Sequence, residues 1–284
     1  MTDSINLLLL ISIMSLLLGV GLSVPFANVL AVATQYQLVA RGLLANFVIV
    51  PCVLTLVLQF VPVGPDVVIG LLILATVPLA PLAPPFVQMA QGDVAYSVGL
   101  TLIVAFLALP LTPLILSFIL PTSESGLEID ALKIFQMLLT AQLIPIGTGL
   151  LINHFRPTWA TVLLCFVPRL GRTGVLLTLV LIAIAQAEQI VDLGVLPYSV
   201  TVGCIVTCLL IGHVMMIGKG GALQRSLAIS TAIRNAAVAL LIVNTNFPNS
   251  QAVTIVFMFG LLSLLVALGY RKIMQSYSGD SLLN

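Results

Sequence analysis

Arg234 is the residue of this sequence whose chemistry most needs an explanation. It lies in the apolar run LAISTAIRNAAVALLIV, residues 227–243, beside Ser230, Thr231 and Asn235. An arginine at the centre of a membrane helix costs about 2.5–3.5 kcal/mol on insertion scales, so it needs a partner, a water-filled cavity or a function. Its planar fork of donors fits a carboxylate well. We therefore expect these four residues to belong to a substrate-binding site.

Three more polar residues interrupt apolar stretches earlier in the chain. Ser97 and Thr101 are four residues apart, so both hydroxyls share one face of a helix. Asn46 is an amide in the stretch ANFVIVP. We count these three residues with the candidate site. The alternatives are that the hydroxyls bond to the preceding helical turn and that Asn46 and Asn235 only tie helices together.

Prolines interrupt the apolar stretch VPLAPLAPPF, residues 77–86. Each proline deletes a helix donor and clashes with the preceding turn, so a continuous helix cannot form there. Irregular backbone at membrane depth is tolerated only where it is buried in protein or lines a cavity. We expect a discontinuous helix of the kind that forms transporter sites, in preference to a kinked one. The residues that break it are Pro78, Pro81, Pro84 and Pro85.

The composition defines the surroundings in which these residues must act. Hydrophobic residues make up 60% of the chain and charged residues 7%, with a mean hydropathy of +1.24. These values indicate an all-α integral membrane protein, because apolar helices of roughly 20 residues span a bilayer. Nine spans are expected, at residues 5–24, 38–62, 67–90, 93–120, 130–153, 168–187, 194–217, 222–244 and 250–271. The sixth is short unless residues 159–167 also contribute, which would leave Arg169 and Arg172 near its cytoplasmic end.

The order of the irregular spans suggests an inverted repeat. The third span carries the prolines and the eighth carries Arg234, so each half of the chain would contain one interrupted helix. We expect one transporter domain over residues 1–274, with a first repeat at about 5–120 and a second at about 130–272. Residues 275–284 are expected to form a disordered cytoplasmic tail.

Positive charges predict the orientation of the bundle. Lys and Arg are retained on the cytoplasmic side of short loops. The loops on the side of the C-terminus hold Arg41, Arg156, Arg169, Arg172, Lys219, Arg225, Arg271 and Lys272, whereas the opposite side holds Lys133. The acids Asp66, Glu124, Glu128, Asp130, Glu188 and Asp192 also fall on that opposite side. We expect a cytoplasmic C-terminus and an external N-terminus in the cell membrane.

Several stretches resemble the bile acid:sodium symporter (BASS) superfamily in its nine-helix form. They are, in order, ANFVIVP at 45–51, VPLAPLAPP at 77–85, QGDVAYSVGLT at 91–101 with PLTP at 110–113, and RNAAVALLI at 234–242. The resemblance implies a panel domain and a core domain, with two broken helices crossing in the core. It implies repeats of four and five helices, and alternating access of organic anions to the crevice between the domains.

The family's sodium ligands do not carry over to this chain. The resemblance places an acidic residue near Ser230, a Ser-Asn pair at Ala83 and Pro84, and a Gln at Arg234, while Ser97 and Thr101 alone match directly. No metal site is therefore expected beyond these two residual matches. We interpret Arg234 as a tethered cation that either replaces a bound ion or pairs with an anionic substrate. The structural alternative is that Arg234 bonds to carbonyls of a broken helix and only holds the core together.

The sequence thus predicts a secondary transporter of a small organic anion, of the carboxylate or steroid-conjugate class, that does not use the usual two sodium sites. A sodium-coupled symporter is the alternative, and a transporter-derived channel or sensor is an alternative of another class. An enzyme is not expected, because no nucleophile with a base lies at membrane depth. The expected partners are the anion and the lipid bilayer, without cofactor or nucleic acid; the oligomeric state is left open.

Overall fold

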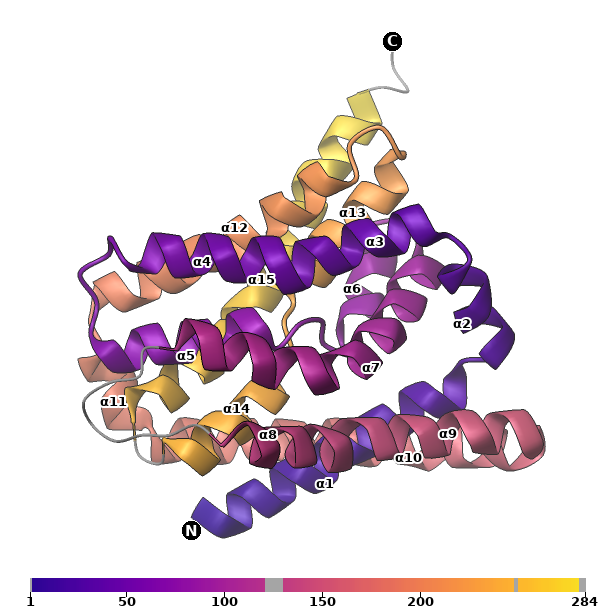
Figure 1. The fold of residues 1–284 in the computed structure, drawn as a ribbon, viewed down its shortest axis with the longest axis horizontal. Coiled ribbons are helices and arrows are strands. Elements are labelled where there is room, and N and C mark those ends of the chain that lie inside the picture. The colour runs from indigo at the N-terminus through magenta and orange to yellow at the C-terminus, as the bar shows by residue number, and fades with distance from the viewer. Residues whose placement is uncertain (1, 121–129, 248–249, 281–284) are drawn as a thin grey trace.

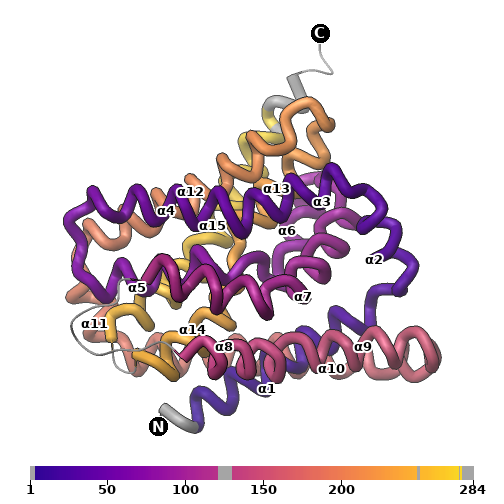
Figure 2. Tube along the Cα trace, viewed as in Figure 1, coloured from indigo at the N-terminus to yellow at the C-terminus, as the bar shows by residue number. Residues whose placement is uncertain are grey.

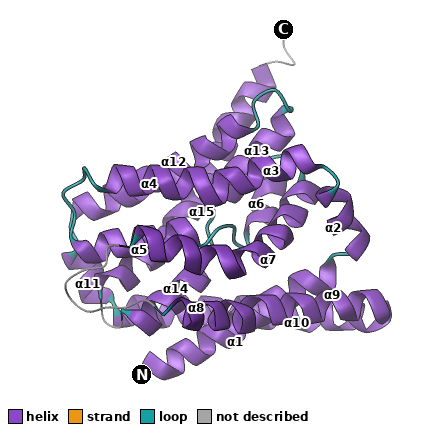
Figure 3. Ribbon diagram, viewed as in Figure 1, coloured by secondary structure: helices purple, strands orange, loops and turns teal. Residues whose placement is uncertain are grey.

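The fold was analysed in a computed structural model that describes residues 2–120, 130–247 and 250–280. The described residues form helices joined by short loops, without a strand among them (Figure 3). Within these ranges, eight helical segments are long and apolar enough to cross a membrane, and the apolar helix Pro65–Thr76 is shorter. The all-α membrane fold is therefore confirmed.

Figure 1 labels most of the elements whose bounds follow. The first half holds α1 (Thr2–Ser23), α2 (Phe26–Ala33), α3 (Tyr36–Leu44), η1 (Ala45–Ile49), α4 (Val50–Leu58), α5 (Pro65–Thr76), α6 (Ala83–Met89) and α7 (Val94–Ile119). The second half holds α8 (Ala131–Leu138), η2 (Leu139–Leu143), α9 (Ile144–Phe155), α10 (Pro157–Ala185), α11 (Ala187–Asp192), α12 (Val195–Met215), α13 (Gly221–Ala232), α14 (Ala236–Asn246) and α15 (Gln251–Asp280). The segments η1 and η2 are single turns of π-helix.

One layer of the molecule consists of α1, the segment α8–η2–α9, and α10. Helix α1 packs along both α9 and α10, and the three lie together at the lower edge of Figure 1. Gly21 of α1 and Gly149 of α9 meet face to face, since a Cβ on Gly21 would lie 2.3 Å from the Ile146 carbonyl oxygen. Small residues at this crossing let two backbones approach closely, which is how membrane helices gain packing contacts. We call this layer the panel.

The remaining long helices form the second layer, which we call the core. It contains α3 to α7 and α12 to α15, with α13 packed against α12 and α5 against α15. Of the candidate spans, the one that holds α13 and α14 is the most buried, and its break lies deep inside the protein. Figure 2 shows that α1 begins and α15 ends on opposite sides of the molecule.

The sixth span differs from the expected boundaries. We expected it to begin at residue 168, but α10 begins at Pro157 and contains Pro168 in its interior. Pro168 packs on Gly19 of α1, where a Cβ would come within 2.8 Å of the proline ring. Arg169 and Arg172, which we had counted as loop residues, therefore lie in the middle of a helix.

Two smaller differences concern segments between and after the spans. The stretch after the first span, which we expected to be a loop, forms the short helix α2. Helix α15 continues to Asp280, past residue 275, where we expected a disordered tail to begin. Residues 281–284 of that tail, and Glu124 and Glu128 of the acidic loops, lie outside the described residues.

Candidate functional site at the crossing of two broken helices

Two helices are broken where they cross, and the breaks are joined by a backbone hydrogen bond. The first break separates α5 from α6 at residues 77–82, and the second separates α13 from α14 at residues 233–235. The Ala80 amide donates to the Ile233 carbonyl over 3.0 Å. Two discontinuous helices were expected, and the structure confirms both. Four helix ends therefore meet at one place. At two of them the last carbonyls, and at the other two the first amides, have no partner within their own helix.

The four prolines of the first stretch have two different roles. Pro78 and Pro81 lie in the break itself, whereas Pro84 and Pro85 lie in the first turn of α6. We expected all four to break the helix, which was wrong for the second pair. Proline is well accommodated in a first helical turn, because the amide it lacks has no helical partner there in any case.

Arg234 is held inside the core by four oxygen contacts. Its side chain is 1% exposed. Nε donates to the Leu74 carbonyl at 2.6 Å, and Nη2 donates to the Ala75 carbonyl at 2.8 Å. The other two contacts are with Asn46, from Nη1 to Oδ1 at 3.3 Å and from Nη2 to the main-chain oxygen at 3.4 Å. The guanidinium thus uses its planar fork on oxygens that come from two other helices.

These contacts place a positive charge at the carboxyl end of α5. The last carbonyls of a helix carry a partial negative charge and have no partner within the helix. Leu74 and Ala75 are among these last carbonyls of α5, and the next one, that of Thr76, accepts the hydroxyl of Thr112 at 2.8 Å. Arg234 and Thr112 together satisfy the end of a helix that stops at membrane depth.

The main-chain oxygen of Asn46 is free for Arg234 because of the π turn in which Asn46 lies. The Val50 amide bonds to Ala45 rather than to Asn46, so the hydrogen-bond register shifts by one residue. The next residue, Pro51, has no amide hydrogen to restore a bond. The Asn46 side chain donates to the Gly42 carbonyl at 2.9 Å and to the Thr231 hydroxyl at 3.4 Å. The amide thereby connects α3 with α13, and its oxygen contacts Arg234 in the second break.

Ser97 and Thr101 do not converge on a common point. The Ser97 hydroxyl bonds to the Ser230 hydroxyl at 2.8 Å, which links α7 to α13. The Thr101 hydroxyl donates to the Ser97 carbonyl of its own helix at 2.8 Å. Sodium is a hard cation that requires several oxygen ligands around one point. Here the Ser97 hydroxyl bonds to Ser230 and the Thr101 hydroxyl to a carbonyl of its own helix. Among the described residues, no group of three His, Cys, Asp or Glu side chains is suited to a metal.

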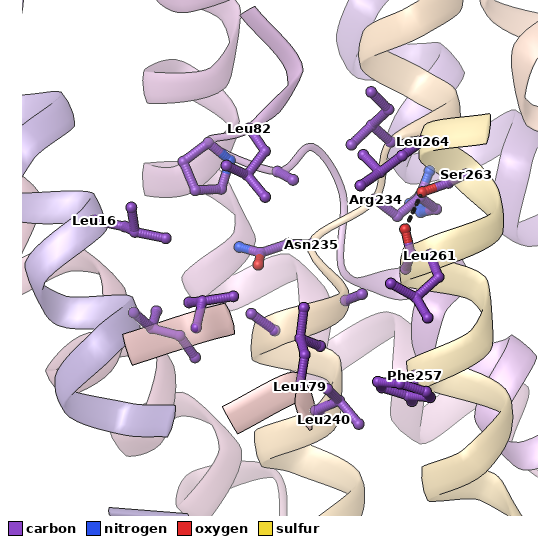
Figure 4. A pocket seen from close by; sticks show the side chains of 18 of the residues that line it. Leu16, Leu82, Leu179, Arg234, Asn235, Leu240, Phe257, Leu261, Ser263 and Leu264 are labelled. Atoms are coloured by element: carbon purple, nitrogen blue, oxygen red, sulfur yellow. Dashed lines mark hydrogen bonds between the residues drawn. The ribbon is translucent and has the colours of Figure 1, made fainter. Parts of the chain in front are cut away.

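Asn235 points in the direction opposite to Arg234. Its side-chain oxygen accepts the Val238 amide at 3.3 Å and so caps α14, while Nδ2 donates to Oε1 of Gln142 over 3.5 Å. Figure 4 shows the Asn235 amide directed toward Leu16 of α1, in the panel, with Arg234 on the far side of the break. The two adjacent polar residues therefore make their hydrogen bonds in different regions, Arg234 in the core and Asn235 toward the panel, although both line the cavity between these layers.

A cavity of about 80 Å³ lies beside Asn235 between the panel and the breaks. Apolar side chains of α1, α10, α14 and α15 form most of its wall, among them Leu16, Leu179 and Phe257 (Figure 4). A second cavity, of about 190 Å³, lies further along α1 and is lined by Val20, Ser23 and Thr101. Pro81 borders both cavities. The first break thus separates two hollows between the panel and the core.

Two residues of the site were missed in the sequence. Gln142 is 4% exposed, lies in the second π turn and donates to the Ala105 carbonyl at 2.9 Å. Thr112 bonds to the end of α5, as described above. A signal existed for Gln142, since an amide shortly before a proline occurs both in ANFVIVP and in AQLIP. All seven residues we assigned to binding are buried, and Thr101 also lines the second cavity beside α1.

A multi-pass helical bundle with two broken helices that meet at their breaks belongs to a class of secondary-transporter folds. A family model described as "Sodium Bile acid symporter family" matches residues 8–193 of the chain. The match covers more than half of the chain, so the chain belongs to this family. No curated protein matches the chain in a sequence search. The matched range ends before α13, and the second break with Arg234 therefore lies outside it.

Proposed function

We propose that this protein is a secondary transporter that moves a small organic anion by alternating access and does not use the usual two sodium sites. The observation that carries the proposal is the Arg234 guanidinium, bound to the carboxyl end of α5 and to both oxygens of Asn46. In this view Arg234 is a built-in cation between the crossing helices. It takes the place that a bound ion occupies in sodium-coupled relatives.

Electrostatics support this role for Arg234. A guanidinium keeps its charge at any physiological pH, so the carboxyl end of α5 is neutralised whether or not sodium is present. A sodium ion placed among the same oxygens would be repelled by that charge and would compete with it for the lone pairs. The nearby hydroxyls of Ser97 and Ser230 bond to each other and offer no negative charge.

The cavity between panel and core supports the class of substrate. Its wall is mainly apolar, with the Asn235 amide and the amino end of α14 on one side. Helix amino ends attract anions through their free amides and their dipole. An apolar molecule with one carboxylate or sulfonate matches this arrangement. We therefore assign substrate contact to Asn235, with Gln142 and Ser230 as supporting residues, and we assign Arg234 to charge replacement rather than to direct pairing.

The two hollows on either side of Pro81 support alternating access. One borders the N-terminal half of α1 and the other borders its C-terminal end. A substrate would leave one hollow and enter the other when the panel shifts against the core. We further propose that the protein lies in the cell membrane with its N-terminus outside, which antibody access to terminal epitope tags on intact and permeabilised cells would test.

The test is uptake of labelled organic anions by proteoliposomes that hold the purified protein, with sodium or potassium outside. We expect accumulation that persists without sodium. Arg234→Gln should abolish uptake or make it sodium-dependent, and Arg156→Gln is the control, because Arg156 is exposed and in a turn. Strict sodium dependence of the unaltered protein would contradict the built-in cation. Equilibration without accumulation would support the channel alternative instead.

A further inference from the structure

Helix α10 carries an unusual outer face. The residues that point away from α1 and α9 recur at helical spacing and are exposed. At the two ends of this face they are mainly apolar, but its middle holds Arg169, Arg172 and Thr173. The apolar flanks are Val162, Phe166, Leu176, Val180 and Ile184, which are 54–70% exposed. A positive pair therefore interrupts an apolar face that no other described element covers.

The two arginines have almost no partners within the protein. Among the described residues, the Arg169 side chain makes no hydrogen bond or ion pair, and Arg172 donates only to the Pro168 carbonyl of its own helix, at 3.2 Å. Neither α9 nor α10 contains an Asp or Glu. Each guanidinium facing hydrocarbon alone would cost about 2.5–3.5 kcal/mol. An external anion is the simplest way to avoid this cost.

The depth of the pair follows from the packing of α10 on α1. Pro168 lies against Gly19, and Gly171 lies against Leu16. Because α1 ends at Ser23 and a helix rises 1.5 Å per residue, the pair lies about 6–10 Å inside the end of α1. Long arginine side chains extend toward the membrane interface from such depths. A headgroup phosphate at the level of the end of α1 would lie within their reach.

We propose that Arg169 and Arg172 bind the phosphate of an anionic phospholipid on the outer face of the panel. The two guanidiniums are one turn apart and provide charge-assisted donors, which phosphate oxygens accept well. The apolar flanks, such as Phe166 and Leu176, would contact the acyl chains. A second copy of this chain would fit this face less well. A two-fold contact would bring four guanidiniums together, and neither α9 nor α10 has an Asp or Glu to neutralise them.

The site would tie the panel to the lipid leaflet on the C-terminal side. Helix α10 belongs to the panel and packs along α1, which also borders both cavities at the crossing. A bound headgroup would fix the height of the panel in the bilayer. This property does not depend on which anion is transported or on whether sodium is used.

Native mass spectrometry of the purified protein, titrated with phosphatidylglycerol or with phosphatidylcholine, tests the proposal. We expect the unaltered protein to prefer phosphatidylglycerol, and Arg169→Gln/Arg172→Gln to lose roughly tenfold or more of that affinity, as the loss of a charged hydrogen bond predicts. Arg169→Lys/Arg172→Lys should retain most of the preference, because it keeps the charge. Thermal unfolding of each variant shows that it is folded.

The control is Arg156→Gln/Lys272→Gln, which removes two positive charges from the same end of the protein but leaves α10 intact. Retained preference in this control, with loss in the α10 variant, would support a specific site. Equal loss in both variants would show a general surface-charge effect and overturn the proposal. So would equal binding of the two lipids by the unaltered protein, or a dimer that the α10 variant dissociates.

Discussion

The two breaks at the crossing differ in length and in chemistry. The first contains residues 77–82, with two prolines and no polar side chain, whereas the second contains only Ile233, Arg234 and Asn235. The first break depends on groups supplied from elsewhere, since Arg234 and Thr112 satisfy the end of α5. The second break supplies polar side chains to the core and to the panel. One break thus sets backbone geometry, and the other provides the charge and the polar contacts.

This difference explains why one arginine can stabilise two broken helices. Arg234 belongs to the second break, but its partners lie at the end of the first crossing helix and on η1. The bond from Ala80 to Ile233 holds the two breaks in register. Loss of the second break's side chains should therefore affect the protein more than loss of the first break's prolines.

The largest effect is expected for Arg234→Met. The substitution keeps an unbranched apolar stem but leaves the Ala75 carbonyl buried without a donor, and it removes the positive charge from the end of α5. We expect the free energy of unfolding to fall by about 2–4 kcal/mol. Denaturant unfolding in detergent micelles measures it. Arg234→Lys should lose less, because the charge remains; an unchanged stability of Arg234→Met would show that the end of α5 needs no cation.

Asn46→Leu should have the second-largest effect. It removes one acceptor for Arg234 and the contact with Thr231, so we expect a loss of about 1–2 kcal/mol. A double-mutant cycle with Arg234→Met should show a coupling of about 0.5–1 kcal/mol or more, because the two side chains bond directly. Strictly additive losses would mean that Asn46 and Arg234 act independently.

Thr112→Val should cost about 1 kcal/mol of stability. The change retains the shape of the side chain and removes the donor to the Thr76 carbonyl, which belongs to the end of α5. Ser117→Ala is the matched control, because that hydroxyl is on the same helix, is exposed and bonds only to its own helix. We expect the thermal unfolding midpoint to fall more for Thr112→Val than for Ser117→Ala. Equal shifts of the midpoint would contradict a special role for Thr112.

The smallest effect is expected for Pro81→Ala. The break is held by the Ala80–Ile233 bond and by the Arg234 contacts, so the proline is not required to keep it open. We expect a change in unfolding free energy within about 0.5–1 kcal/mol. A loss above about 2 kcal/mol, on the scale of the loss for Arg234→Met, would show that the proline itself maintains the first break. The comparison between the two breaks would then have to be reversed.

Much of the fold could be predicted because its signals are local. Apolar stretches of spanning length located the membrane helices, and prolines located the first break. The start of α10 was placed too late because Pro168 marks a helix boundary in the sequence, whereas in the structure the helix continues through it. The π turns were missed for a related reason: Asn46 and Gln142, the amides in them, bond to residues far away in the chain.

The sequence by itself determined the solvent, the family and the presence of a buried charge at residue 234. Composition, periodicity and local motifs are enough for these, because each depends on neighbouring residues. Only the tertiary structure decided that Arg234 faces the core while Asn235 faces the panel, and that Arg169 and Arg172 lie on an outer helix face. The physical reason is distance along the chain: the Leu74 carbonyl that Arg234 binds is 160 residues away, and only the packed fold brings the two together.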